Sequence, residues 1–265
     1  MKKRALFLIV ILWCLNLFAQ NAVSDQHSGI SRNPDARLIL DHCAQAMGSP
    51  RDGLEVIAEG QTRHESSDSV SSVLIKTRGL EQFRLERRGA ETTELSIINR
   101  GSGQHHWQGQ IVPMRRHTTA YFRADHLPAL MCSDSRLGRE MTITYVGMDV
   151  VVSRPVFHIK LNAIPQGKSE QADAIESLIS EYHIFVDRDS FVVLKTSHYV
   201  FSPDAIENHS LWETLYSDYR VVDGTLMPFQ VANRVSGQRF STTVFGTITT
   251  GVAINDQEFR EAKIK

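Results

Sequence analysis

The 265-residue chain is poor in cysteine, has no surplus of basic charge and contains a single long apolar run. It carries 29 Lys and Arg against 30 Asp and Glu, a balance that supplies no positive field to hold phosphate groups. We therefore expect no nucleic-acid partner. No segment after residue 19 approaches the roughly 18 apolar residues that mark a spanning helix, so we expect none there.

The chain also lacks the short motifs that mark common catalytic sites. It contains no G-x-S-x-G turn of the kind that exposes a serine nucleophile. His64-Glu65 is not followed by the second histidine of a metalloprotease helix. A hydrolase whose serine, histidine and aspartate come from distant positions stays open, because such a site leaves no local signature. We expect no catalysis, no cofactor and no metal.

The first nineteen residues have the pattern of a secretory signal peptide. Lys2, Lys3 and Arg4 form a positive start, residues 5–18 follow as an apolar run, and Ala19 offers a small residue for cleavage. The run is shorter than the roughly 20 residues that a spanning helix needs. Cleavage near Ala19 removes three of the 29 basic residues, which leaves 26 against 30 acidic residues and a net charge of −4. We expect a periplasmic or secreted protein.

A polar leader over 20–32 precedes the clearest helical pattern of the chain. Asn33 is a suitable N-cap, Pro34 suits the first helical position, and Gly48 suits the end. The apolar residues between them recur at intervals of three and four and form one buried stripe. They are Ala36, Ile39, Leu40, Cys43, Ala44 and Met47.

From Leu54 onward the apolar period changes to two, which predicts strands joined by tight turns. Asp223-Gly224 is the strongest two-residue hairpin signal. A short helical turn is expected over 124–131. The expected strands cover 70–78, 81–87, 94–100, 103–112, 141–147, 150–153, 156–162, 182–186, 191–201, 216–222, 225–231 and 240–249.

Two features interrupt this meander. Residues 164–176 are expected to form a loop insertion, although the apolar spacing from Ala172 to Ile179 also allows a brief helix. Pro228 lies within an expected strand, which implies an edge or a bulge because proline donates no hydrogen bond to a ladder. Residues 254–259 are expected to end the fold.

This order of elements predicts one α+β domain over 33–260, mostly antiparallel β. It predicts a curved half-barrel sheet whose concave face is covered by the N-terminal helix and the short second helix. An apolar strand face on that side must be covered by helices, by a ligand, or by both.

The chain resembles the LolA/LolB-like superfamily of periplasmic lipoprotein carriers and related outer-membrane lipoprotein-sorting proteins. The resemblance is carried by the helix that ends in Met47-Gly48, the hairpin arms 182–187 and 191–195, the segment 216–229, and the closing segment 254–259. It covers roughly residues 34 to 260 and rests on pattern, with no invariant catalytic motif.

The resemblance implies an unclosed barrel of about eleven strands with helices over an apolar cavity that holds acyl chains in some members. No lipidation cysteine is visible, since Cys14 lies inside the apolar run behind Trp13. The membrane-anchored type of the superfamily is therefore disfavoured. The family's functional residues cannot be mapped onto positions of this chain.

Nine apolar residues that alternate with polar ones are the expected lining of such a cavity. An ordinary filled core under the helix is the alternative for the same positions, because core and trough share one face of a half-barrel. The nine are Phe83, Leu85, Trp107, Phe185, Val192, Leu194, Phe229, Val231 and Phe245.

The histidines give no metal pattern. His105 and His106 are expected in a surface loop, because adjacent strand residues point to opposite faces and rarely share an ion. A turn centred between residues 188 and 189 would place His183 opposite Leu194 and away from His198.

Two cysteines, Cys43 and Cys132, remain after signal-peptide cleavage. In an oxidising compartment they could pair and close a loop worth on the order of 4 kcal/mol. Two unpaired buried thiols are the alternative. We predict the bridge, which would tie the first helix to the short helical segment.

The leading functional hypothesis is a non-enzymatic envelope protein that binds a lipid, a lipoprotein or another amphipathic ligand in the half-barrel cavity. The alternative is a periplasmic sensor or scaffold of the same fold that binds an envelope protein. A hydrolase with a dispersed site is the third hypothesis.

Overall fold

A computed structural model describes residues 34–48, 53–90, 92–114, 119, 122–123, 125–132, 141–164, 167, 169–202 and 207–260. The expected signal peptide and polar leader fall on residues 1–32 and lie outside the described residues.

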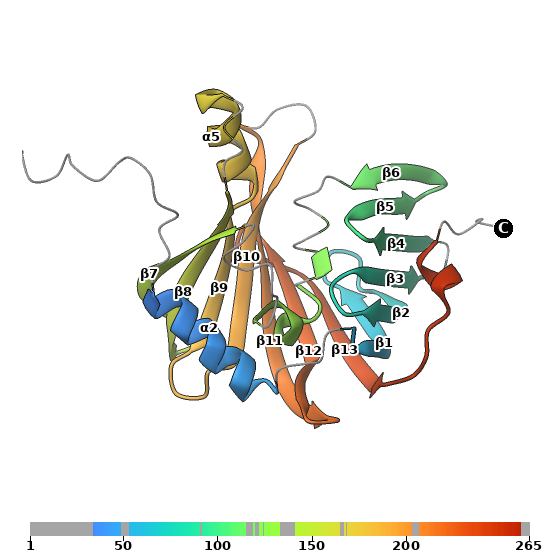
Figure 1. Cartoon of the computed structure of the whole chain (residues 1–265). Helices are drawn as coiled ribbons and strands as arrows, with labels where there is room; N and C mark the ends of the chain where they lie inside the picture. The colour runs from blue at the N-terminus through green and yellow to red at the C-terminus, as the bar shows by residue number, and fades with distance from the viewer. Residues whose placement is uncertain are drawn as a thin grey trace, which may run out of the picture. The chain divides into compact units, whose positions relative to one another are not determined.

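The described residues form one sheet of thirteen strands in the order β6-β5-β4-β3-β2-β1-β13-β12-β11-β10-β9-β8-β7 (Figure 1). Every strand pairing is antiparallel. The prediction of a mostly antiparallel curved sheet with helices is confirmed, with thirteen strands in place of about eleven. The strands are β1 (Glu55–His64), β2 (Ser69–Arg78), β3 (Gln82–Arg88), β4 (Thr93–Asn99), β5 (Ser102–Trp107), β6 (Gln110–Met114), β7 (Met141–Val151), β8 (Arg154–Ala163), β9 (Tyr182–Asp187), β10 (Val193–Phe201), β11 (His209–Val222), β12 (Thr225–Val235) and β13 (Gln238–Thr250).

Tight turns explain where the strand predictions succeeded and failed. Asp223 and Gly224 have φ of 46° and 82°, and positive φ at both central residues is the geometry of the predicted hairpin turn. Gln108 and Gly109 form a similar turn with φ of 50° and 77°. The single strand expected over 103–112 is therefore two strands, β5 and β6. Gln-Gly is a weaker turn signal than Asp-Gly, so the sequence pattern did not reveal it.

The strand pleat divides the sheet into two faces. Phe83 and Leu85 of β3 are fully buried in the main core, and we call the face they share the inner face. Side chains of opposite parity, such as Arg84, lie on the outer face. Register therefore decides for every strand which side chains can meet the helices and which cannot.

Helices α2 (Pro34–Ala46) and α4 (Pro128–Cys132) pack on the inner face as expected. The C-terminal end of α2 lies against the β11–β12 turn, where the Met47 carbonyl accepts a hydrogen bond from the Leu226 amide at 2.9 Å. Gly48 has a φ of 90° and a Cβ there would lie 2.0 Å from the Gly224 carbonyl, so only glycine fits. Among the described residues, no helix is both long and apolar enough to cross a membrane.

The segment expected as a loop insertion at 164–176 contains most of helix α5 (Glu170–Ile179). Ser169 caps it by accepting a hydrogen bond from the Ala172 amide. The brief-helix alternative is therefore the correct one. Pro228 lies in β12, which runs between β11 and β13, but the pairing with β13 begins at Gln230.

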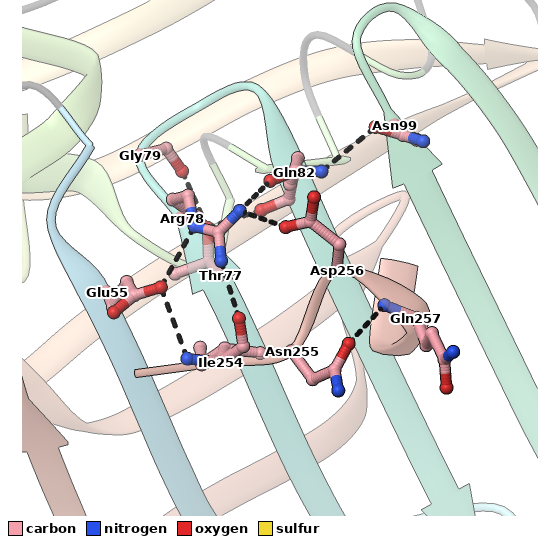
Figure 2. A network of polar contacts seen from close by, with 10 residues as sticks. All are labelled: Glu55, Thr77, Arg78, Gly79, Gln82, Asn99, Ile254, Asn255, Asp256 and Gln257. Atoms are coloured by element: carbon pink, nitrogen blue, oxygen red, sulfur yellow. Dashed lines mark hydrogen bonds and ion pairs between the residues drawn. The ribbon is translucent and has the colours of Figure 1, made fainter. Parts of the chain in front are cut away.

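The C-terminal end of the fold is held on the outer face by one arginine (Figure 2). Arg78 donates to Glu55 at 2.9 Å, to Gln82 at 2.8 Å and to Asp256 at 2.6 Å, and its guanidinium also reaches the Ile254 carbonyl. The short helix η2 (Asp256–Phe259) follows, and the Phe259 side chain is 1% exposed. We call Glu55, Arg78, Gln82, Ile254 and Asp256 the Arg78 clamp.

Candidate functional site

A cavity of about 580 Å³ opens on the inner face, beside the part that the main core fills. We call it the inner-face cavity. Its wall has an aromatic side from three strands and from the segment before α4. The aromatic residues are Trp107 of β5, Phe122, Trp212 of β11 and Phe240 of β13.

The aromatic side chains are partly open to solvent. Trp107 is 53% exposed and Phe240 is 41% exposed. Trp212 and Phe240 lie 5.6 Å apart between ring centroids, and His64 meets Phe240 edge-on at 6.0 Å. Rings held this way present apolar faces that an apolar ligand can cover.

A row of polar side chains crosses four neighbouring strands beside these rings. Thr196, Thr214, Asn233 and Ser241 occupy matching register positions on β10, β11, β12 and β13. Thr214 donates to the Asn233 side-chain oxygen, and Asn233 donates to the Ser241 hydroxyl, both at 3.2 Å. All four are buried, and Asn233 and Ser241 line the cavity. We call these four residues the polar row.

Asp125 lies at one end of the polar row, where it binds Thr196 and lines the cavity. Its Oδ1 accepts hydrogen bonds from the Tyr182 hydroxyl at 2.8 Å and the Thr196 hydroxyl at 3.0 Å. Its Oδ2 lies 3.7 Å from Nδ1 of His198. Burial raises the pKa of Asp125, against the opposing effects of His198 and of the two hydroxyl groups. Tyr216 donates to the Asp125 carbonyl at 3.1 Å and so holds the backbone as well.

Three histidines of the wall have a lowered pKa, which favours their neutral forms. His126 Nδ1 lies 2.7 Å from the Phe122 carbonyl, which fixes the proton on Nδ1 and leaves Nε2 as an acceptor. Burial, with a smaller effect of Arg87, lowers the pKa of His126 to about 4. Burial also lowers the pKa of His198 and of His105. At neutral pH these rings offer hydrogen bonds and apolar surface but little positive charge.

Arg87, the arginine among the described residues of the cavity wall, forms an ion pair with Glu94. Nη1 of Arg87 on β3 lies 3.0 Å from both carboxylate oxygens of Glu94 on β4. The two residues are directly opposite each other in the β3–β4 register. Their charges cancel locally, so the pair contributes polarity without a net charge.

The nine residues expected to line a cavity occupy three different places. Trp107 lines the inner-face cavity. Phe185 and Leu194 lie on the outer face in a small separate cluster with Val151 and Val156. Phe185 alternates with the inner-face residues Ile184 and Val186 of β9, and Leu194 is turned outward by a bulge between Val193 and Lys195 of β10. The other six are buried in the main core under the helices: Phe83, Leu85, Val192, Phe229, Val231 and Phe245.

Two histidine predictions were wrong. His105 and His106 lie in strand β5, where His106 is 1% exposed, and not in a surface loop. His183 pairs in register with Ser197 instead of Leu194, because the β9–β10 loop is longer and includes Phe191 at a φ of 55°. The side chain of His183 meets His158 on the outer face, with the two rings joined by a 2.7 Å hydrogen bond.

The sequence interpretation missed Asp125, His126 and His198 as wall residues. Asp125 and His126 lie in the segment 124–131 that was expected as a short helical turn, but α4 begins only at Pro128. The large apolar residues of that segment all follow His126, so the pattern assigned neither residue a face. His198 had a detectable signal, since it shares parity with Thr196 and Val200 on β10. Among the described residues, no group of three or more histidine, cysteine or acidic side chains is placed to hold a metal ion.

The cavity residues do not assemble a serine nucleophile with the His198–Asp125 pair. Ser241 lies on β13 and His198 on β10, three strands away in the sheet order. At about 4.8 Å for each strand the separation is roughly 14 Å, far beyond a hydrogen bond. The Ser241 hydroxyl instead accepts from Asn233.

Cys43 of α2 and Cys132 of α4 are brought together as free, buried thiols. Burial, with a contribution from a side-chain hydrogen bond to Cys132, raises the pKa of Cys43. The two helices that carry them pack against each other within the main core. The expected neighbourhood of the two residues is present, while the bridge itself stays a prediction.

Comparison with solved structures places this arrangement among known folds. A putative outer membrane lipoprotein-sorting protein domain from Vibrio parahaemolyticus matches with a TM-score of 0.53 and 9% identity, over 84% of this chain and 97% of that one. A LolA superfamily protein from Nitrosomonas europaea matches with a TM-score of 0.53 and 11% identity, over 85% and 97%. The chain has the LolA-like fold.

A third match is a DUF1329 family protein from Desulfovibrio piger, with a TM-score of 0.53 and 10% identity over 85% of this chain and 97% of that one. No protein-family model and no curated protein sequence matches the chain. At these identities the likeness concerns the LolA-like fold alone. The chemistry of the inner-face cavity must therefore be argued from its own residues.

Proposed function

We propose that this chain is an exported envelope protein that binds one lipid or acylated ligand in the inner-face cavity and performs no covalent chemistry. The observation that carries the proposal is the cavity itself, whose volume of about 580 Å³ lies in the usual range for a small-molecule site. Its position beside the covering helices of a LolA-like sheet supports the same conclusion. Export rests on the signal-peptide pattern of the first nineteen residues.

The cavity lining combines apolar and polar side chains, which suits the two ends of an amphipathic molecule. The aromatic side, with Trp107, Trp212 and Phe240, can cover an apolar chain at about 0.8 kcal/mol for each buried methylene. The polar row and Asp125 can receive a hydrogen-bonding head group. The filled core around Phe83 and Leu85 limits the ligand to the open part of the face.

Native mass spectrometry of the delipidated mature chain tests the proposal. We expect one copy of a single-chain amphiphile to bind, and Val200→Trp to abolish binding because Val200 lines the cavity and is 49% exposed. The matched control is Val244→Trp, at a 51% exposed valine outside the cavity lining, which should bind normally. Failure of every amphiphile to bind would overturn the proposal.

Affinity capture from intact envelopes separates the carrier from the scaffold alternative. Recovery of the protein with copurifying lipid supports the carrier. A stoichiometric protein partner, recovered without lipid and retained by Val200→Trp, would contradict the carrier and favour a scaffold of the same fold.

A further inference from the structure

The charge inventory of the inner-face cavity is asymmetric. Among the described lining residues, Arg87 is the cationic side chain, and both oxygens of Glu94 engage it. Asp125 is the remaining acid, and its nearest basic group is the His198 ring at 3.7 Å. A ligand that enters the cavity therefore meets a carboxylate that no lysine or arginine of this lining balances.

The geometry of Asp125 leaves one oxygen suited to a ligand. Tyr182 and Thr196 both donate to Oδ1, which holds that oxygen of the carboxylate in place. Oδ2 faces His198 across 3.7 Å, a separation longer than an N–H···O hydrogen bond. A donor on a ligand head group can therefore bind Oδ2 directly, at a shorter distance than His198 does. Charge-assisted hydrogen bonds of this kind are about twice as strong as neutral ones.

The neighbours of Asp125 favour the same sign of ligand charge. His126 presents a neutral ring whose Nδ1 proton is committed to the Phe122 carbonyl, so its Nε2 accepts hydrogen bonds. Elsewhere on the cavity lining, Trp107 and Trp212 add aromatic faces that attract cations through their ring quadrupoles. A carboxylate or phosphate head group would meet Asp125 and these acceptors with no uncommitted cation among the described lining residues.

We propose that the inner-face cavity selects single-chain amphiphiles with a cationic, hydrogen-bond-donating amine head group, and that Asp125 binds the ammonium while the aromatic side covers the chain. This inference rests on the proposed function and narrows its ligand class. The cavity should bind an anionic acyl ligand of the same chain length with lower affinity, although the cationic and the anionic ligand have the same apolar part.

Isothermal titration calorimetry of the full mature chain at neutral pH tests the selection with three probes that share one alkyl chain. They are dodecylammonium, dodecanoate and dodecyl phosphate, each below its micelle concentration. We expect dodecylammonium to bind about tenfold or more tightly than either anion, a difference of about 1.4 kcal/mol. Equal or tighter binding of dodecanoate overturns the proposal, and this ranking depends on no variant.

Asp125→Asn assigns the effect to the carboxylate. The amide oxygen can still accept from Tyr182 and Thr196, so the variant is suited to folding, which near-ultraviolet circular dichroism checks. We expect its ammonium affinity to fall about tenfold while dodecanoate affinity stays or rises. Asp189→Asn, at an acid 69% exposed in the β9–β10 turn, is the control and should change neither affinity.

The two proposals fail differently. If all three probes bind and Val200→Trp removes them, but the ammonium has no advantage, the cavity function stands and the head-group selection is wrong. If Asp125→Asn folds and retains the full ammonium advantage, Asp125 is not the group that binds it. If no probe binds the wild-type chain, the proposed function itself is contradicted.

Discussion

The Arg78 clamp and the Asp125 cluster are both polar networks on one sheet, yet they differ in what surrounds them. The clamp lies on the outer face, where Arg78 donates to three side chains (Figure 2). The Phe259 ring, 5.7 Å from the Arg78 guanidinium, is only 1% exposed. Asp125 lies on the inner face beside a cavity of about 580 Å³. The clamp is a partly exposed network that ties the C-terminal segment to a filled part of the fold, with Arg78 30% and Asp256 58% exposed. Polar groups beside open space, such as Asp125, are instead available to a ligand.

The largest difference in stability between the two regions is expected from a phenylalanine-to-alanine substitution made once beside the clamp and once at the cavity wall. Phe259→Ala removes a ring that is 1% exposed, so we expect the free energy of unfolding to fall by about 3–5 kcal/mol. Phe240→Ala removes a ring that is 41% exposed at the cavity wall, and its cost should stay below about 1 kcal/mol. Urea unfolding measures both. Similar losses for the two variants would mean that the cavity wall is as structural as the clamp.

The thiols of α2 and α4 test how firmly the inner-face helices are fixed. If Cys43 and Cys132 form the predicted bridge, reduction should lower stability on the order of 4 kcal/mol. Thiol labelling of unreduced, denatured protein should then find no reactive cysteine. Two labelled thiols per chain would reject the bridge. The stability of Cys43→Ser and that of the reduced wild-type chain should then respond to oxidant in the same way, because neither forms the bridge.

Acid should weaken the inner face before it weakens the clamp. The pKa of His126 falls from 6.5 to about 4 on folding, so the unfolded chain takes up a proton first as the pH drops. Stability that is present above pH 6.5 should therefore decline by about 3 kcal/mol as the pH falls toward 4.

The clamp carboxylate of Asp256 has a pKa lowered by Arg78 and should lose its contribution only at more acidic pH. His126→Gln removes one titrating ring and should reduce the slope of urea midpoints between pH 6.5 and 4, to which the lowered pKa values of His158, His198 and His105 also contribute. An unchanged slope would mean that another group controls this window.

The smallest effect is expected from Arg78→Lys. Lysine keeps the positive charge but lacks the planar fork that reaches Glu55, Gln82 and Asp256 together. We expect the thermal midpoint to fall by a few degrees and amphiphile affinity to stay unchanged. Loss of binding in this variant would show that the two faces are coupled.

The sequence predicted the fold better than the site, because strands follow from local sequence patterns whereas the site depends on which residues of separate strands lie opposite each other. Period-two alternation and Asp223-Gly224 are local signals, and they located the strands and their principal hairpin. The polar row instead forms from Thr196, Thr214 and Asn233 on separate strands, which only the pairing register aligns.

The same limit applies to the expected lining residues. Phe83 and Phe229 were assigned to the correct face, but alternation does not tell how far α2 and α4 extend over it. Asp125 reaches the cavity from just before α4, in a segment whose large apolar residues begin only at Leu127. Filling of a face is decided by tertiary packing, which a strand pattern does not encode.

The placement of the tryptophans has a spectroscopic consequence. The chain has three tryptophans, and Trp13 lies in the expected signal peptide. The other two, Trp107 and Trp212, both line the inner-face cavity, whereas the Arg78 clamp contains none. After signal-peptide cleavage the tryptophan emission of the protein would therefore come entirely from the cavity wall. The molecule would carry its own optical reporter of that site, with no attached dye and no tryptophan elsewhere in the sheet.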